Sequence, residues 1–304
     1  MSDSVRIVEV GPRDGLQNEK TPIGVADRIA FIKALIGAGL HTIEVGAFVS
    51  PKAIPQMMNS DQVLRGVNHH PDGEFHVLVP NEKGYDAARE AGARVIAVFA
   101  SASEGFSRAN INCSVVESIE RFKPVVARAR ADGIKVRGYI SCVLGCPFDG
   151  EVKPQAVVDV SKVLWKLGCY EVSLGDTIGV GTPVKARQLL RAVAGSVPMA
   201  NLAMHFHDTY GQALANLYAG MEEGARVIDS AAGGLGGCPY APGATGNVAT
   251  EDVVYLLEGM GIATGIDMQS LVAASNAISR LIGRPPASRV ASALNAKKRL
   301  ANSE

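Results

Sequence analysis

Two histidines one residue apart are the sharpest chemical signal in the chain. His205 and His207 stand in the segment MHFHD (204–208), at the end of an apolar run that predicts a β-strand. Residues i and i+2 of a strand face the same side, so both imidazoles point one way. Two imidazoles beside a carboxylate form half of a divalent-metal site. A lone histidine would be interpreted as a core residue or a loop hydrogen-bonder, but this pair at a strand end favours metal binding.

Two oxygen-bearing side chains elsewhere would complete such a site. Asp14 follows the first apolar run of the chain, and Asn247 follows the last one and adds an amide oxygen. Two oxygens and two nitrogens, with room left for water or substrate, suit Mg²⁺ or Mn²⁺, and the imidazoles also admit Zn²⁺ or Co²⁺. Taken in isolation, Asp14 in the tripeptide Arg-Asp-Gly would be interpreted as a turn-former.

Further polar side chains lie within or directly after other predicted strands. They are Glu44, Asp176 and, in the segment GPRDGLQNEK at 11–20, the residues Arg13, Gln17 and Lys20. Chemistry in parallel α/β folds gathers at the carboxyl ends of the strands, so these side chains are candidates for the same site.

A glycine-rich segment, 233–237, precedes Cys238. A dinucleotide-binding loop would need G-x-G-x-x-G opening a helix, but Cys-Pro follows here and no helix is expected before about Ala249. We interpret the segment as a mobile lid that carries Cys238 at its tip. The alternative for Cys238 is a small buried filler, the role expected of Cys113 and Cys169.

The elements that must position these residues alternate between strand and helix. Helix-like stretches at 25–38, 114–133, 154–167 and 212–223 place apolar residues three or four apart. The strand starts advance by roughly thirty residues, the size of one βαβ unit, which predicts a parallel sheet. The eight expected strands are 5–10, 42–45, 75–79, 94–100, 135–141, 171–174, 202–206 and 227–231.

Eight units favour a closed (β/α)8 TIM barrel over an open doubly wound sheet. The densest polar strand ends belong to the seventh, eighth, first and second strands, which are neighbours only when the barrel closes. We predict one barrel domain over 1–304, with 267–304 as a C-terminal helical addition.

Composition narrows the class of protein. The 304 residues include 30 Lys plus Arg and 30 Asp plus Glu, a zero net charge that argues against a nucleic-acid binder. Hydrophobic residues make up 47%, which excludes bulk disorder. The five cysteines form no C-x-x-C pair, which fits a reducing compartment. With no signal peptide and no apolar run of about 18 residues, we expect a cytoplasmic protein without membrane contact.

Several of these segments resemble 3-hydroxy-3-methylglutaryl-CoA (HMG-CoA) lyases, metal-dependent barrels with an Asp-Arg-Glu theme. The resemblance covers nearly the whole chain. It is carried by GPRDGLQNEK (11–20), FVSPK (48–52), YISCVLGCP (139–147), HFHD (205–208) and, most specifically, GLGGCPYA (234–241).

The resemblance implies cleavage of HMG-CoA into acetyl-CoA and acetoacetate, and a homodimer. It implies that Asp14, His205, His207 and Asn247 bind the metal, and that Arg13, Glu44 and Cys238 are catalytic. Glu44, Asp14 and His205 are the candidates for taking the hydroxyl proton, and Glu44 would either orient Arg13 or assist a proton relay. It places Asp176 and Gln17 nearby. Lys20 is a candidate for the CoA phosphates, together with Lys52, Arg284 and Arg289.

Some positions depart from the family pattern and leave the acyl group open. Where relatives often carry hydroxyl residues and a Trp, this chain has Gly46, Ala47 and Ala53. Smaller residues beside the acyl pocket would admit a different 3-hydroxyacyl-CoA. The remaining alternatives are a Claisen-condensing synthase of the same superfamily, against which the Cys238 segment argues, and a non-catalytic metal- or CoA-binding barrel.

Overall fold

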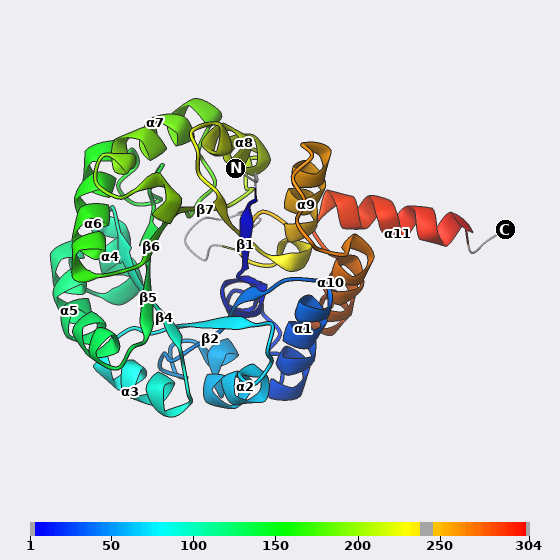
Figure 1. The fold of residues 1–304 in the computed structure, drawn as a ribbon, viewed down its shortest axis with the longest axis horizontal. Helices are drawn as coiled ribbons and strands as arrows, with labels where there is room; N and C mark the ends of the chain where they lie inside the picture. Colours follow the sequence, from blue (N-terminus) through cyan, green and yellow to red (C-terminus); the bar gives the residue numbers. More distant parts are fainter. Residues whose placement is uncertain (1–3, 238–245, 302–304) are drawn as a thin grey trace.

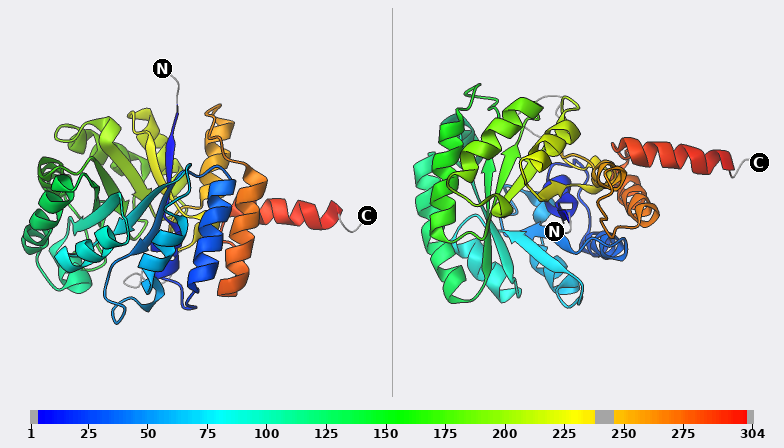
Figure 2. Two further views of the ribbon diagram at one scale, coloured as in Figure 1. Left: turned by 60° about the horizontal axis from the view of Figure 1, so that its bottom comes forward. Right: turned by 45° about the horizontal axis from the view of Figure 1, so that its top comes forward.

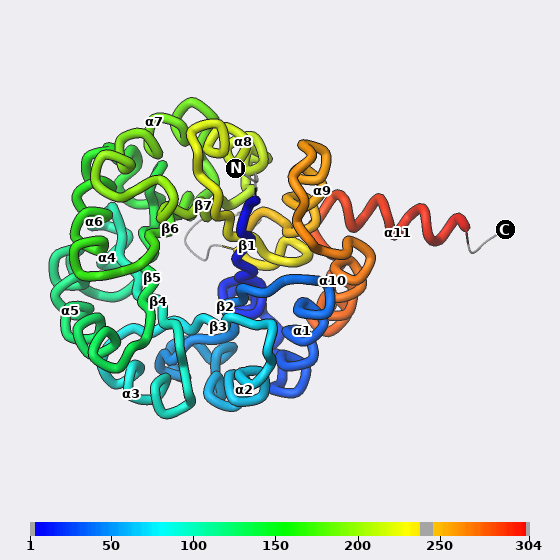
Figure 3. Tube along the Cα trace, in the orientation of Figure 1, coloured from blue at the N-terminus to red at the C-terminus, as the bar shows by residue number. Residues whose placement is uncertain are grey.

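The computed structural model describes residues 4–237 and 246–301. Eight parallel strands pair in sequence order, and the eighth pairs with the first, so the sheet is a closed barrel (Figures 1 and 3). The predicted (β/α)8 barrel is therefore confirmed, and the open doubly wound sheet is excluded. The strands are β1 (Arg6–Glu9), β2 (Thr42–Ala47), β3 (Glu74–Leu78), β4 (Val95–Ser101), β5 (Lys135–Ser141), β6 (Glu171–Asp176), β7 (Leu202–Phe206) and β8 (Val227–Ser230).

Helices surround the barrel and connect successive strands, as two further views show (Figure 2). Two of them, α4 and α5, lie between β4 and β5. The helices are α1 (Val25–Gly37), α2 (Ser60–Val67), α3 (Glu82–Glu90), α4 (Glu104–Ile111), α5 (Val115–Ala131), α6 (Pro154–Leu167), α7 (Pro183–Ala194), α8 (Ala213–Glu222), α9 (Thr250–Gly259), α10 (Met268–Ile282) and α11 (Arg289–Ala301). No helix within the described ranges is long and apolar enough to cross a membrane.

The C-terminal helices differ in how they join the barrel. Helix α10 packs against both α1 and α9, so it belongs to the ring of helices. Helix α11 contacts α9 and then extends away from the barrel (Figures 1 and 2). The predicted helical addition at 267–304 thus contains one helix that covers the barrel and one that projects from it.

Local sequence explains why helix α6 forms where the periodicity predicts it. Pro154 stands in its first turn, and Gly168 takes a left-handed conformation with a φ of 110° where the helix ends. Val157, Val160 and Leu164 are buried on the face that packs on the barrel. The predicted bounds of this helix agree with the structure, because a start signal, a stop signal and a clear apolar face coincide.

The barrel interior holds a charged layer below the predicted site. Arg137 of β5 is fully buried, and its Nε donates to Glu171 of β6 at 2.6 Å while its Nη2 donates to Asp229 of β8 at 2.7 Å. A buried guanidinium is tolerated only when carboxylates pair with it. These residues sit within predicted strands, but no pattern in the sequence marked them as partners.

Candidate active site and metal centre

The four predicted metal ligands meet at the carboxyl ends of β1 and β7. Asp14 lies in the π-helical turn η1 (Gly11–Gly15), directly after β1. One ligand atom from each of Asp14, His205 and His207 lies within 4.8 Å of the other two. Asn247 forms a β-bridge with His207, and its side-chain amide donates to Oδ2 of Asp14 at 2.8 Å. The fold therefore brings together side chains that are up to 233 positions apart.

The unpaired atoms of this cluster fit a divalent cation. Oδ1 of Asn247 and Nδ1 of His207 are buried without a hydrogen-bond partner among the described residues. Burial lowers the pKa of His207 to about 4, so its imidazole is neutral at pH 7. Burial would raise the pKa of Asp14, but Arg13 and the two histidines lower it to about 2. A carboxylate, a neutral imidazole and an orphaned amide oxygen are ligands that Mg²⁺ or Mn²⁺ accepts.

Asp229 orients the other histidine. Its Oδ2 lies 3.2 Å from Nδ1 of His205, and Nε2 of that ring lies 3.9 Å from Asp14. Burial would lower the pKa of His205, but the hydrogen bond that its ring donates to Asp229 and the charge of Asp14 raise it. A carboxylate on one ring nitrogen fixes the tautomer and leaves the other nitrogen for the metal. Asp229 is a residue that the sequence analysis missed, although a carboxylate inside a strand was the signal that singled out Glu44.

Arg13 is held in place on the rim of this cluster. Its Nε donates to Oε2 of Glu44 at 2.7 Å, and its Nη2 lies 2.6 Å from the same oxygen. Its Nη1 donates to Asp14 at 2.8 Å. Burial would lower the pKa of Arg13, but these two carboxylates raise it above its ordinary value. Its guanidinium also lies 5.7 Å from the ring centre of Tyr139. Arg13 is therefore a fixed cation beside the metal ligands.

A cavity of about 370 Å³ opens above these residues. Its polar wall contains Arg13, Asp14, Gln17, Asn18, His205 and His207. Its apolar wall contains Val49, Ile54, Leu78, Phe99, Phe106 and Ile140. Oε1 of Gln17 is buried there without a partner among the described residues, so it is free to bind a ligand. A pocket lined by both apolar side chains and a few convergent polar groups is typical of a small-molecule site.

Asp176 and Lys20 do not join this cluster, and Cys238 lies outside the described residues. The carboxylate of Asp176 is buried and accepts the backbone N–H groups of Val180 and Gly181, at 3.2 and 2.7 Å, which holds the loop after β6. Burial raises the pKa of Asp176 to about 6. Lys20 is exposed and does not line the cavity. Gly237, the last described residue before Cys238, lines the cavity.

The first half of the glycine-rich segment is not the mobile loop that its composition predicts. Gly233 and Gly234 lie in the buried turn η4 (Ala232–Gly234) with φ angles of 68° and 62°. Two buried carboxylates accept the N–H groups of this turn. Glycine is required here for the left-handed backbone rather than for motion. The same high glycine content serves either purpose, so composition alone could not distinguish them.

The positions that depart from the family pattern have different surroundings. Ala53 lines the cavity, as the pattern predicts for the acyl pocket. Gly46 and Ala47 do not line it. A Cβ atom on Gly46 would lie 2.6 Å from Oγ of Ser60, so Gly46 permits β2 to pack on α2. Of these three positions, only Ala53 is therefore placed to contact a molecule in the cavity.

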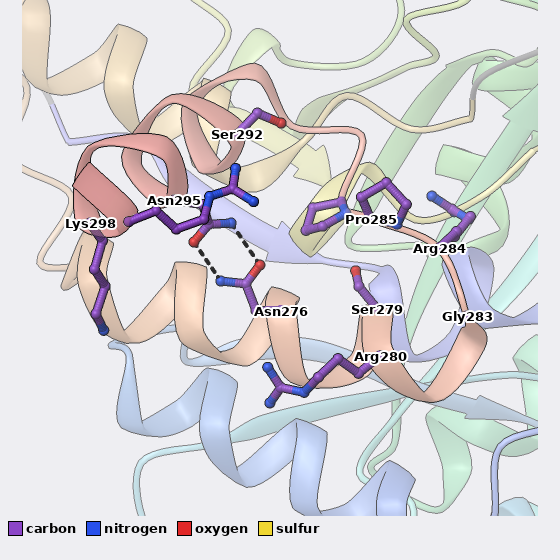
Figure 4. A pocket seen from close by; sticks show the side chains of 11 residues that line it. Asn276, Ser279, Arg280, Gly283, Arg284, Pro285, Ser292, Asn295 and Lys298 are labelled. Atoms are coloured by element: carbon purple, nitrogen blue, oxygen red, sulfur yellow. Dashed lines mark hydrogen bonds between the residues drawn. The ribbon is translucent and has the colours of Figure 1, made fainter. Parts of the chain in front are cut away.

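A second cavity of about 620 Å³ lies between α10 and α11 (Figure 4). Asn276 and Asn295 exchange amide hydrogen bonds of 2.8 Å between the two helices. Arg284, a predicted partner for the CoA phosphates, lines this cavity and pairs with Glu19. No carboxylate, histidine or cysteine lines the cavity among the described residues, so it lacks the groups that C–C cleavage needs.

Comparison with known proteins decides the family. A family model described as HMGL-like matches residues 4–278. The chain belongs to this family. It is 59% identical over 293 residues to the 3-hydroxy-3-isohexenylglutaryl-CoA/hydroxy-methylglutaryl-CoA lyase of Pseudomonas aeruginosa, covering 96% of this chain and 98% of that one. It is 52% identical to the human mitochondrial hydroxymethylglutaryl-CoA lyase, with 95% and 89% covered.

Solved structures agree with this family. A crystal structure of hydroxymethylglutaryl-CoA lyase from Pseudomonas aeruginosa superposes with a TM-score of 0.95 at 58% identity, covering 98% of this chain and 99% of that chain. The resemblance to HMG-CoA lyases that the sequence motifs indicated is thus confirmed over nearly the full length of this chain.

Proposed function

We propose that this protein is a lyase that cleaves HMG-CoA into acetyl-CoA and acetoacetate with the help of a divalent cation. The observation that carries the proposal is the convergence of Asp14, His205 and His207 beside Arg13 in one cavity. Membership of the HMGL-like family and the names of relatives at 52–59% identity support the same reaction.

The reaction breaks the C2–C3 bond of the substrate. The tertiary hydroxyl at C3 gives its proton to one of the candidate bases, Asp14, His205 or Glu44, and becomes the ketone of acetoacetate. The bonding electrons pass to C2 and the thioester as an enolate. Protonation at C2 then gives acetyl-CoA. Asp14, His205, His207 and Asn247 would hold the cation, which would lower the pKa of the substrate hydroxyl and orient it when bound.

The other site residues carry charges that suit these reaction steps. Arg13 remains protonated and would stabilise the developing enolate oxygen. Glu44 holds Arg13 through one hydrogen bond and a close ion pair, which favours an orienting role over a proton relay. Cys238 would donate the proton that C2 gains, and Gln17 would contact the substrate through its unpaired oxygen. We assign the cation as Mg²⁺ or Mn²⁺, because oxygen ligands make up half of the set.

A second candidate substrate has a longer acyl group. One wall of the cavity is apolar, and Ala53 leaves room beside it. The relative from Pseudomonas aeruginosa is named for both isohexenylglutaryl-CoA and HMG-CoA. These two observations favour activity on both a short and a branched long-chain 3-hydroxyacyl-CoA.

A coupled assay for acetyl-CoA release tests the proposal. Metal-free protein is given HMG-CoA, then Mg²⁺ or Mn²⁺, and the same assay is repeated with an isohexenyl analogue. Metal-dependent release of acetyl-CoA and acetoacetate supports the lyase. Net condensation of acetyl-CoA with a keto acid would favour a synthase, and tight CoA binding without turnover would favour a non-catalytic barrel.

Other expectations about this protein stay predictions. The homodimer, a single domain over 1–304 and a role of Lys20 at the CoA phosphates rest on the resemblance and on sequence patterns. A cytoplasmic location is also a prediction, and the human relative's name places that protein in mitochondria.

A further inference from the structure

Two buried carboxylates outside the predicted site hold the turn η4 from opposite sides. Oε1 of Glu9, the last residue of β1, accepts the N–H groups of Gly11 at 2.7 Å and Ala232 at 3.0 Å. Oε1 and Oε2 of Glu251, in the first turn of α9, both lie 3.0 Å from the N–H of Gly233. Both side chains are fully buried. The two carboxylates thus satisfy backbone N–H groups of η1 and η4 that would otherwise be buried without a partner.

Hydroxyl groups complete the surroundings of both carboxylates. Thr250 donates to Oε2 of Glu9 at 2.6 Å, and Ser275 of α10 donates to Glu251. Among the described residues, neither carboxylate lies within ion-pair distance of a Lys, Arg or His. Burial raises the pKa of each to about 7, and the charge of Glu9 adds to the rise at Glu251.

The two turns that these carboxylates bind are in contact with the metal ligands Asp14 and Asn247. Glu9 binds the first N–H of the turn that presents Asp14. Gly15, next to Asp14, packs so tightly on Leu235 that a Cβ atom would lie 2.6 Å from Cβ of Leu235. The carbonyl of Leu235 accepts the side-chain amide of Asn247 at 3.2 Å, and the same amide donates to Asp14. The backbone of the turn therefore sets where the Asn247 amide points.

We propose that Glu9 and Glu251 are positioning residues that fix Asp14 and Asn247 relative to each other and so set the affinity of the metal site. Glu9 ties the turn η1 to η4, and Glu251 ties η4 to α9, the helix that begins three residues after Asn247. The inference rests on the proposed metal site. Partners outside the ligand set typically change metal affinity by about 10- to 100-fold when they are replaced.

The test measures Mn²⁺ binding to the free protein by electron paramagnetic resonance, without substrate. Glu9→Gln keeps the shape but replaces one acceptor oxygen with an NH₂ group, which then faces the donors of Gly11, Ala232 or Thr250. Gly11→Ala disturbs the same contact from the other side, because its Cβ would lie 2.5 Å from Oε1 of Glu9. We expect the Kd for Mn²⁺ to rise about tenfold or more in both variants.

A matched control comes from the residue next to Glu251. Asp252 also accepts backbone N–H groups, those of Arg289 and Val290 at the start of α11, but it has no contact with η4. Asp252→Asn should keep the wild-type Kd, whereas Glu251→Gln should raise it. In turnover assays, Glu9→Gln should lower kcat more than it raises KM.

The outcomes separate the inference from the proposed function. If folded Glu9→Gln and Gly11→Ala bind Mn²⁺ as tightly as wild type, the carboxylates are structural only and the inference is wrong. If Glu9→Gln fails to fold, Gly11→Ala decides alone. If Asp252→Asn weakens binding as much as Glu251→Gln, the effect is general and the inference also fails. Wild-type protein that binds Mn²⁺ but does not cleave HMG-CoA would refute the proposed function and leave the positioning role intact.

Discussion

Replacing Asp229 by Asn should change both the affinity of the metal site and the unfolding free energy of the barrel, and a comparison variant can distinguish the two effects. Asp229 contacts Nδ1 of His205 at 3.2 Å on one side and accepts Nη1 and Nη2 of Arg137 at 3.0 and 2.7 Å on the other. Ser173 also donates to it at 2.8 Å. The substitution keeps the shape of the side chain but removes the negative charge that both partners face.

Two magnitudes follow from these contacts. Removing one partner of a buried ion pair typically costs about 3–5 kcal/mol. Arg137 keeps its bond of 2.6 Å to Glu171, so we expect the lower end, about 3 kcal/mol of unfolding free energy. His205 loses the carboxylate that fixes its tautomer, so the Kd for Mn²⁺ should rise about 10- to 100-fold.

Chemical denaturation and Mn²⁺ titration of the same samples measure both effects. Glu171→Gln is the comparator, because Glu171 pairs with Arg137 and Arg6 but does not contact His205. It should lower the unfolding free energy by a similar amount and leave the Kd for Mn²⁺ near the wild-type value. Wild-type Mn²⁺ affinity in Asp229→Asn, or an equal loss of affinity in Glu171→Gln, would show that Asp229 does not act through His205.

Four further predictions address the chemistry. Exhaustive chelation should abolish acetyl-CoA release and Mg²⁺ or Mn²⁺ should restore it; full activity in verified metal-free protein would remove the metal from the mechanism. Arg13→Met should lower kcat by roughly 10²-fold or more with a smaller change in KM, and an unchanged kcat would make Arg13 a binding residue only. Cys238→Ala should lower kcat by about 10²- to 10⁴-fold, keep its metal content and resist thiol-directed inactivation, since the four described cysteines are buried; near-normal turnover would contradict a proton-transfer role. Ala53→Trp should lower kcat/KM for a long-chain substrate far more than for HMG-CoA, and an equal effect on both would place the acyl group elsewhere.

Local patterns in the sequence predicted the elements and the ligand candidates. The spacing of His205 and His207 follows from strand geometry alone, since alternate residues share a face. The strands 135–141 and 202–206 have the predicted bounds, because buried parallel strands are short apolar runs with abrupt ends. The closure of the barrel was also predicted, from the count of eight units and from polar strand ends that only a ring makes adjacent.

Contacts between distant segments were decided by the tertiary structure alone. Asp229, Arg137 and Glu9 are charged residues within predicted strands, but whether such a side chain points into the barrel, and which partner it meets, depends on the register of eight strands. The glycines at 233 and 234 were interpreted as part of a mobile loop, whereas in the structure both lie in a buried turn whose Ala232 and Gly233 N–H groups are bound by two buried carboxylates. Sequence fixes the chemistry that each side chain carries and the local path of the backbone. Burial, pKa and partnership depend on which other groups the closed barrel places within a few ångströms, and no local pattern contains that information.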